Sequence, residues 1–395
     1  MKNLLLATAA CALTAGAAVA AEDVKLGIIF GFTGPLESIT PSMASGAELA
    51  MKEVSDSGKL LDGTKVSSVR GDSTCIDAAA ATAAAERLVT SDKVAAIIGA
   101  DCSGVTGAIL TNVAIPNGLV MISPSSTSPG LSTVEDKGLF FRTAPSDARQ
   151  SEVLAQILMD RGIKEVAVTY TNNDYGKGLS DSFKTAYEAA GGKVTAVSAH
   201  EDGKADYSAE VGSLASAGGE ALVVAGYVDQ GGAGMIRASL DSGAFSKFVL
   251  PDGMYGNVLE EKFGTSLDGS FGTVPGSDSP GGATYQEMAK AAGFDGTSSY
   301  SPESYDAAAL IMLAMQAAGS TKSADFVGKI MEVANAPGEK IYPGELGKAL
   351  DLLKEGKDID YVGGSAVELV GPGEAAGSYR EYDFKNGKIE TTGYR

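Results

Sequence analysis

Tryptophan is absent from this sequence of 395 residues, and histidine occurs once, at His200. A zinc site needs three or four ligands, and one histidine supplies too few of them. The same imidazole is the only one available as the base of a Ser-His-Asp triad. Its acidic neighbours, in the stretch HEDGKAD, predict a solvated position in a loop. The scarcity of histidine therefore argues against a metal centre and against triad catalysis.

Long apolar runs are scarce too, and the one at the N-terminus has the features of a secretory signal. Lys2 gives a positive start, residues 4–19 are apolar or small, and Ala18-Val19-Ala20 is a cleavage site of the A-x-A type. We therefore predict a signal peptide at residues 1–20, cleaved after Ala20 or Ala21. No later segment has 18 uninterrupted apolar residues, which predicts a soluble protein outside the cytoplasm.

Basic residues are outnumbered by acidic ones. The chain has 31 Lys and Arg against 50 Asp and Glu, and its formal net charge of −19 becomes −20 when Lys2 leaves with the signal. Nucleic acids and anionic membranes call for a basic face, so neither is an expected partner.

A mature chain of about 374 residues is longer than one typical domain and predicts two.

Cysteine is the third rare residue. Of the three cysteines, Cys11 lies in the predicted signal peptide, so Cys75 and Cys102 remain in the mature chain. Two cysteines in an oxidising compartment most simply form a disulfide. A metal site is the alternative, although the chain offers few other ligands for it.

What the sequence has in abundance is alternation between short apolar runs and helical patterns. This alternation predicts βαβ units and parallel sheets. It restarts after LFFRTAPSD (139–147), which predicts two successive α/β sets. The expected strands are 24–30, 64–72, 94–100, 165–170, 193–199, 221–227 and 247–251, and the expected helices are 41–58, 77–91, 148–161, 175–191, 206–217 and 229–242.

The C-terminal part is less regular. GTVPGSDSPGG (272–282) predicts a crossing between the two sets, and residues 301–319 predict a helix. Met312 and Met315 of that helix are expected in the core rather than in a cofactor site. The remaining expected elements are a helix at 323–338 and a hairpin at 379–395, with Asn386-Gly387 as its turn.

No catalytic motif emerges from this framework. Ser103 lies in IIGADCSGVTGA (97–108), where a strand gives way to a helix, but a G-x-S-x-G motif would need glycine in place of Asp101. GGAGMIRA (231–238) is not a G-x-G-x-x-G motif, and a P-loop sequence is absent. The sequence therefore predicts that the protein is not an enzyme and has no cofactor.

Ser103 is better suited to binding. A hydroxyl and free N–H groups at a strand-to-helix junction form an anion site, aided by the helix dipole. Ser125, Ser126 and Thr127 follow a second predicted strand, in MISPSSTSPG (121–130), and open α/β sheets bind ligands at such strand ends. Ordinary capping explains either cluster alone, but the two together favour a binding site.

Eight segments of the chain carry a recognisable pattern in their order and spacing. They are GFTGPL (31–36), GAELAMKEV (46–54), GDSTCIDAAAA (71–81), IIGADCSG (97–104), MISPSSTSP (121–129), NDYGKGL (173–179), VVAGYVDQ (223–230) and LPDG (250–253). Over nearly all of its mature length the chain resembles the periplasmic Leu/Ile/Val-binding proteins, the solute receptors of branched-chain amino acid ABC transporters.

The resemblance implies a two-lobed α/β fold of the type I periplasmic binding protein class, in which each lobe is a parallel sheet flanked by helices and three hinge crossings join the lobes. Residues 21–141 and 276–358 would form the N-terminal lobe, and 142–275 and 359–395 the C-terminal lobe. The third crossing is the least defined, because 337–364 is longer than in compact family members.

The implied function is a monomeric periplasmic receptor without a cofactor. It would capture a small zwitterionic ligand, most simply an aliphatic or branched-chain amino acid, and deliver it to a membrane ABC permease. Two alternatives stay open: a receptor of the same fold for an amide, urea or an aromatic acid, and a ligand receptor that serves a sensor kinase.

The resemblance also assigns roles in the first lobe. Cys75 and Cys102 match the two cysteines of a family disulfide that holds the loop before the binding serine. Ser103 and Thr127 match residues that hold the ligand carboxylate through hydroxyl and N–H groups. The carbonyl of Ser125 matches one that accepts from the ligand ammonium.

In the second lobe, Asp252 matches the acidic residue that pairs with the ammonium, which is often Glu in the family. Tyr175 and Tyr227 match aromatic walls of the site. Ile39 falls where some members have a large aromatic residue lining the side-chain pocket. Asp229, two residues after Tyr227, is a further departure at the pocket edge and a substitute partner for the ammonium.

Overall fold

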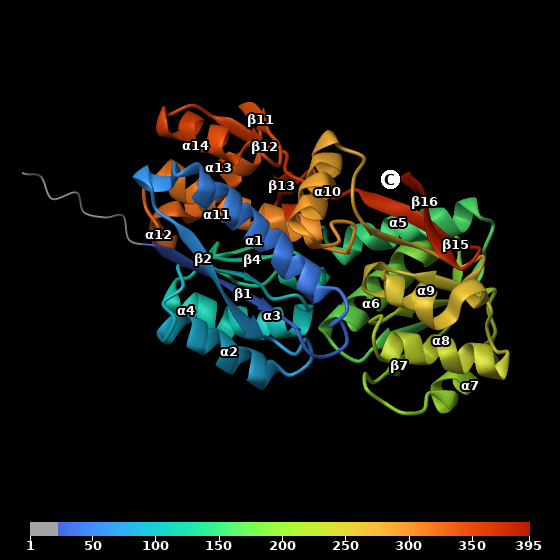
Figure 1. Ribbon diagram of the computed structural model, residues 1–395. Helices are drawn as coiled ribbons and strands as arrows, with labels where there is room; N and C mark the ends of the chain where they lie inside the picture. Colours follow the sequence, from blue (N-terminus) through green and yellow to red (C-terminus); the bar gives the residue numbers. More distant parts are fainter. Residues whose placement is uncertain (1–22) are drawn as a thin grey trace, which may run out of the picture.

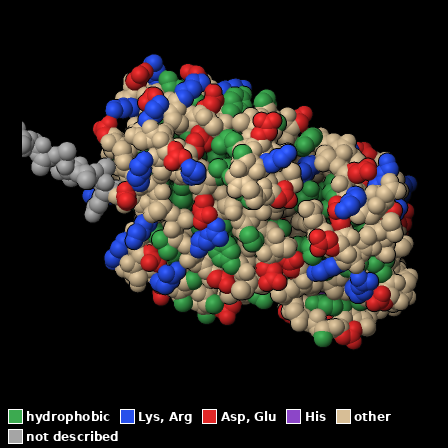
Figure 2. All heavy atoms as spheres, in the orientation of Figure 1, with side chains coloured by type: hydrophobic (Ala, Val, Ile, Leu, Met, Phe, Trp, Pro, Cys, Tyr) green, Lys and Arg blue, Asp and Glu red, His purple; other side chains and the backbone are tan. Residues whose placement is uncertain are grey.

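The structure, a computed structural model, describes residues 23–395, so the predicted signal peptide at residues 1–20 lies outside the described residues. The chain forms two α/β lobes, which lie on the left and right of Figure 1. Within the described part, helices long and apolar enough to span a membrane are absent. Acidic and basic side chains are interspersed over the face shown in Figure 2.

The first lobe is built on a sheet with the strand order β13-β14-β5-β4-β3-β1-β2. Strands β1 to β5 pair in parallel, whereas β13 and β14 pair antiparallel. Strands β3 and β4 are buried along their whole length, as expected where helices cover both faces. The strands are β1 (Val24–Phe30), β2 (Val66–Asp72), β3 (Ala96–Gly99), β4 (Met121–Ser123), β5 (Phe140–Arg142), β13 (Leu369–Val370) and β14 (Glu374–Ala375).

Helices cover both faces of this sheet. Helices α1 and α11 pack together on one face, and α2 and α3 lie on the other (Figure 1). The core position predicted for Met312 and Met315 is confirmed, because both are fully buried in α11. The helices of this lobe are α1 (Thr40–Ser57), α2 (Ala78–Thr90), α3 (Ser103–Ile109), α4 (Ile115–Asn117), α10 (Pro280–Ala292), α11 (Ser301–Ala318), α12 (Ser323–Phe326), α13 (Ile330–Ala334) and α14 (Leu346–Lys354).

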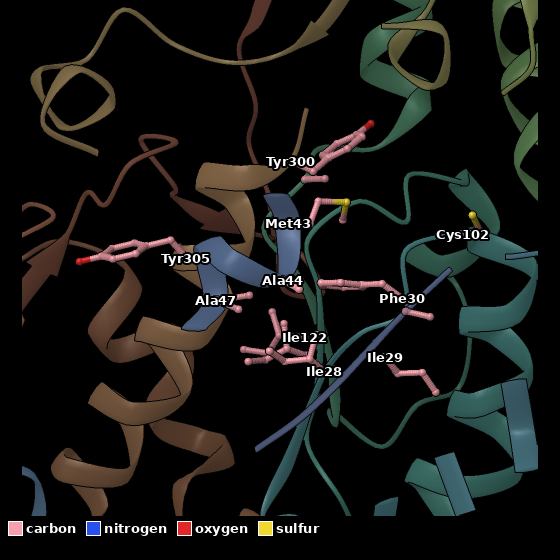
Figure 3. Close-up of a cluster of buried hydrophobic side chains, with 14 of the residues drawn as sticks. Ile28, Ile29, Phe30, Met43, Ala44, Ala47, Cys102, Ile122, Tyr300 and Tyr305 are labelled. Carbon is pink, nitrogen blue, oxygen red and sulfur yellow. The ribbon is translucent and has the colours of Figure 1, made fainter. Parts of the chain in front are cut away.

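Figure 3 shows part of the core of this lobe, where α1 packs on the sheet. Ile28 of β1 and Ile122 of β4 are fully buried, and Ala44 and Ala47 of α1 face them. The two alanines are three residues apart and therefore lie on the same side of the helix. Their small side chains let the helix approach the strands closely, which places the N-terminal end of α1 beside the strand ends.

The second lobe repeats the arrangement with the strand order β16-β15-β10-β9-β8-β6-β7. Strands β6 to β10 are parallel, and β15 and β16 form the predicted antiparallel hairpin around Asn386-Gly387. The strands are β6 (Glu165–Thr171), β7 (Lys193–His200), β8 (Ala221–Ala225), β9 (Phe248–Leu250), β10 (Phe271–Pro275), β15 (Tyr379–Lys385) and β16 (Lys388–Tyr394), and the helices are α5 (Asp147–Asp160), α6 (Asp174–Ala189), α7 (Ser208–Ala217), α8 (Gly231–Ser242) and α9 (Asn257–Phe263).

The chain passes between the two sheets three times, after β5, after β10 and after β14. The third passage differs from the boundary at residue 358 that the resemblance implied. Strand β12 (Ile359–Tyr361) pairs with β11 (Glu339–Ile341), and β14 pairs with β5, so these segments belong to the first lobe. The lobe changes between β14 and β15, at residues 376–378.

Two other expectations near the C-terminus need correction. The segment 272–282 is not one long crossing, because it contains the end of β10 and the start of α10, and only 276–279 connects them. The helix expected at 323–338 is broken into α12, a 3₁₀ turn at 327–329, and α13. Short elements of this kind give too few periodic positions for a pattern to show.

His200 is not a solvated loop residue, so that prediction was wrong. It is the last residue of β7 and is 1% exposed. Its Nδ1 lies 2.7 Å from the Thr169 hydroxyl oxygen, and the Tyr207 ring packs edge-on against it. Burial lowers the pKa of the imidazole to about 4. The exposed acidic stretch begins one residue later, at Glu201.

Candidate ligand-binding site

The first part of the site follows β3, at its carboxyl end. Gly99 has φ 136°, and a Cβ there would lie 2.3 Å from the carbonyl oxygen of Ile29. Only glycine permits this close approach between β1 and β3. Helix α3 then begins at Ser103, which is 2% exposed and accepts a hydrogen bond from the N–H of Ser128 at 3.1 Å.

Cys75 and Cys102 form a disulfide, with their Cα atoms 5.2 Å apart, which confirms the predicted pair. The bond joins the loop after β2 to the residue immediately before Ser103. Asp101, next to it, accepts hydrogen bonds from the N–H of Gly31 at 2.9 Å and from the Ser73 hydroxyl at 2.7 Å. The backbone that presents Ser103 is therefore fastened on both sides.

The second part of the site is the turn at 124–128, which follows β4. Its serines bond to the segment after β3: the Ser125 hydroxyl donates to the Asp101 carbonyl at 2.9 Å, and Ser126 and Thr106 hydroxyls are 2.6 Å apart. Because β3 and β4 are neighbours, the two serine clusters lie side by side at one edge of the sheet.

Arg142, which sequence reasoning missed, holds this turn in place. Its guanidinium is 1% exposed and donates to the carbonyls of Ser126 at 3.0 Å and Ser128 at 2.9 Å, the two residues that flank Thr127. It also forms an ion pair with Glu374 of β14. The signal for its role was an arginine at the end of the apolar run in LFFRT, since a buried arginine needs several partners.

The structure brings the three residues predicted in the second lobe together. Tyr175 lies in the first turn of α6, Tyr227 follows β8, and Asp252 follows β9. The two tyrosine rings stack with their centroids 5.1 Å apart, and the Tyr175 hydroxyl donates to Asp252 Oδ1 at 2.9 Å. All three side chains are buried.

A second carboxylate, which sequence reasoning also missed, is Asp147 in the first turn of α5. It is fully buried, and its N–H donates to the carbonyl of Thr127 at 2.8 Å. Within residues 23–395, no hydrogen bond of good geometry reaches its carboxylate oxygens, but the Thr127 hydroxyl lies close enough to lower the pKa of the carboxyl. An aspartate after a serine cap is an ordinary helix start, so the sequence carried no sign that Asp147 would be buried between the lobes.

The electrostatics of the two carboxylates are linked. Burial, followed by the negative charge of Asp252, raises the pKa of the Asp147 carboxyl well above its ordinary value. Burial also raises the pKa of Asp252, against the hydrogen bonds from Tyr300 and Tyr175. In the part of the chain that the structure describes, no side-chain cation forms a salt bridge with either one. The charge of Arg142 lowers the pKa of Asp147, but burial and Asp252 outweigh it.

The lobes meet around these residues. The Ser128 hydroxyl of the first lobe donates to the Asp174 carbonyl of the second at 3.1 Å. Asp229, expected at the pocket edge, accepts from the N–H of Ser38 at 2.9 Å across the cleft. Ile39, the next residue, lines a cavity of about 290 Å³ between α1 and the segment 255–258. Ile39 thus lies at the cleft, although no contact joins it to the carboxylate pair.

The geometry does not form a catalytic triad. Ser103 is bonded to Ser128 in the first lobe, whereas His200 is bonded to Thr169 in the second. The structure instead brings together hydroxyl groups from one lobe, aromatic rings from the other, and two acidic groups where the lobes meet.

Comparison with known proteins agrees with this geometry. The sequence profile of a family described as periplasmic binding protein matches residues 23–344. The Leu/Ile/Val-binding protein homolog 1 of Brucella melitensis is 31% identical over 345 residues, covering 86% of this chain and 88% of that protein.

Two solved structures share the fold. The branched-chain amino acid transporter substrate-binding protein LivJ of Streptococcus pneumoniae, in complex with isoleucine, has a TM-score of 0.77 at 22% identity and covers 94% of this chain and 99% of that one. A solute-binding protein of R. palustris in complex with benzoate has a TM-score of 0.74 at 19% identity and covers 94% of this chain and 96% of that one. The predicted resemblance is confirmed, and the chain belongs to the periplasmic binding protein family, among the relatives of the Leu/Ile/Val-binding proteins.

Proposed function

We propose that this protein is an extracytoplasmic receptor that captures an aliphatic or branched-chain amino acid between its lobes and delivers it to a membrane ABC permease. Membership of the family and the Leu/Ile/Val-binding relative support this function. The benzoate-bound structure has the same fold, so the choice of ligand class rests on the site itself.

In this proposal the first lobe holds the ligand carboxylate. Ser103 and Thr127 contribute hydroxyl and N–H groups, and the carbonyl of Ser125 accepts from the ammonium. Thr127 is buried beside the Asp147 carboxyl, where the lobes meet, and this position supports the role. Tyr175 and Tyr227 close the site from the second lobe, and Ile39 borders the side-chain pocket.

One observation carries the assignment: Asp147 and Asp252 are buried together at the meeting of the lobes. Two buried carboxylates destabilise each other unless a cation lies between them or one is protonated. An α-ammonium group supplies that positive charge. Benzoate would bring a further negative charge to the pair, and urea or an amide would bring no positive charge to it.

Isothermal titration with leucine, isoleucine and valine, each beside its analogue without the amino group, tests the proposal. We expect the amino acids to bind at least 100-fold more tightly than the deaminated acids, equivalent to about 3 kcal/mol. Benzoate and urea are the controls for the alternative ligands. Equal binding of leucine and 4-methylpentanoate, or tight binding of benzoate alone, would contradict the assignment.

The proposal includes export and a monomeric state. Residues 1–20 would direct the chain through the inner membrane, with cleavage after Ala20 or Ala21, which fits the extracytoplasmic location of the family. The intact mass of protein from the periplasmic fraction tests the cleavage site. Light scattering of the purified protein tests the monomer, and a dimer with the cleft at its interface would contradict direct delivery to a permease.

A further inference from the structure

Asp252 is held by two tyrosines that come from different lobes. Tyr175, in the second lobe with Asp252, donates to one carboxylate oxygen at 2.9 Å. Tyr300 donates to the other oxygen. Tyr300 directly precedes α11, the helix that packs against α1 in the first lobe. One hydrogen bond of this pair is therefore internal to a lobe, and the other crosses the cleft.

The backbone at Tyr300 indicates that its side chain is specifically required. Its φ of 61° and ψ of 7° lie in the left-handed region, which is unfavourable for a bulky side chain and free of cost for glycine. The bonds of Ser304 hold this conformation, because its N–H and its hydroxyl both donate to the Tyr300 carbonyl, at 2.9 and 2.8 Å. A strained aromatic residue aimed at a buried carboxylate points to a role for its hydroxyl.

The contact exists only while the lobes are together. Tyr300 and Asp252 are 3% and 2% exposed, so the hydrogen bond between them is shielded from water. A hydrogen bond to a carboxylate in such surroundings is stronger than one between neutral groups. Three connections join the two sheets, and a separation of the lobes would return both groups to water.

We infer that Tyr300 is a positioning residue that ties the first lobe to Asp252, so that the cleft closes partly without ligand and presents Asp252 in a fixed orientation to the ammonium. The part that concerns the ammonium rests on the proposed function. The part that concerns closure does not, because it needs no ligand.

The two tyrosines provide a matched pair of variants for the test. Tyr300→Phe removes the hydroxyl that crosses the cleft, and Tyr175→Phe removes the hydroxyl that binds the same carboxylate within one lobe. Lys52→Cys on α1 and Lys184→Cys on α6 place dyes on the two lobes for single-molecule energy transfer. The labels attach selectively because the other two cysteines of the mature chain are bonded to each other.

Without ligand, we expect a closed population in the parent protein that falls at least 5-fold in Tyr300→Phe and stays within 2-fold in Tyr175→Phe. A parent protein without a ligand-free closed population, or equal losses in both variants, would overturn the inference. These measurements need no amino acid, so they stand even if the ligand proves to be of another class.

A double-mutant cycle tests whether Tyr300 acts through Asp252. With leucine, Tyr300→Phe should weaken binding about 10-fold in the parent protein and less than 2-fold when Asp252 is already Asn. An equal loss in both backgrounds would show that Tyr300 acts on the ligand by another route and would overturn the inference. Circular dichroism melts of each variant establish that the fold is retained. Failure of the parent protein to bind any amino acid would instead count against the proposed function.

Discussion

At the scale of single residues, the proposed site depends on two acidic side chains that repel each other, Asp147 and Asp252. Replacing either with Asn keeps its size and removes its charge. We expect each variant to bind leucine about 30- to 1,000-fold more weakly, or about 2–4 kcal/mol, with little change for 4-methylpentanoate. Isothermal titration with both compounds measures the difference.

The same substitutions should act in the opposite direction on the ligand-free protein. Asp147 is fully buried, and burial and the charge of Asp252 raise its pKa, so Asp147→Asn removes an unfavourable charge and should raise the melting temperature without ligand. Glu152→Gln, at an exposed position on the same helix, is the control and should change neither the leucine affinity nor the melting temperature. A lower melting temperature with unchanged affinity would assign Asp147 a purely structural role.

His200 makes the stability of the second lobe sensitive to acid. Its pKa is lowered by burial from 6.5 to about 4, so the unfolded chain binds more protons than the folded one between these values. Its contribution is complete above pH 6.5 and is lost as the pH falls toward 4, by up to about 3 kcal/mol. Denaturant unfolding between pH 4 and 7 should show a shallower decline for His200→Gln. Equal slopes for the two proteins would mean that the imidazole does not titrate in this range.

At the scale of elements, the disulfide fixes the junction of β3 and α3. The bond closes a loop with a sequence separation of 27, and in the chain-entropy model such a bond stabilises the fold by roughly 3–4 kcal/mol. We expect the Cys75→Ser, Cys102→Ser double variant to have a free energy of unfolding that is lower by that amount, measured by denaturant titration. Its affinity for leucine should also fall, because Ser103 follows the bond directly.

Thiol titration provides the matching check on the native chain. Unfolded, non-reduced mature protein should contain no free thiol, since its two cysteines are bonded to each other. Two free thiols in protein from the periplasm would contradict the disulfide. Unchanged leucine affinity in the double variant would show that the loop keeps its shape without the bond.

Much of this framework was predictable from local patterns. Buried parallel strands such as β3 and β8 read as apolar runs, and α11 ends at Gly319 in the left-handed conformation expected of a C-terminal glycine. The serine turns after β3 and β4 were predictable as a joint site because parallel strands end at the same edge of a sheet.

The rest depends on contacts between distant segments. Asp147 looks like a helix-start residue until the lobes bring it to Asp252, 105 positions away in the printed sequence. The pairing of β14 with β5 has no local signature, so the third crossing was placed too early. His200 was misjudged because its acidic neighbours lie on the surface while its own side chain points into the lobe.

At the scale of the whole molecule, the proposed site lies where the two lobes meet. Ser103 and Thr127 come from the first sheet, and Tyr175 and Asp252 from the second, and all four are at most 3% exposed. A ligand reaches groups this deeply buried only if the lobes first move apart. Three short connections, at 143–146, 276–279 and 376–378, join the lobes, and we expect rotation about them to open the cleft.

Ligand binding should therefore shift the molecule from open to closed. A ligand that contacts both lobes binds the closed form more tightly and so increases its population. We expect X-ray scattering to give a smaller radius of gyration with saturating leucine than without it. Asp147→Asn should need a correspondingly higher leucine concentration to reach the same radius. An unchanged radius at saturating leucine would mean that the ligand binds to one lobe alone or that the free protein is already closed. A free protein that is already closed would also bind leucine slowly.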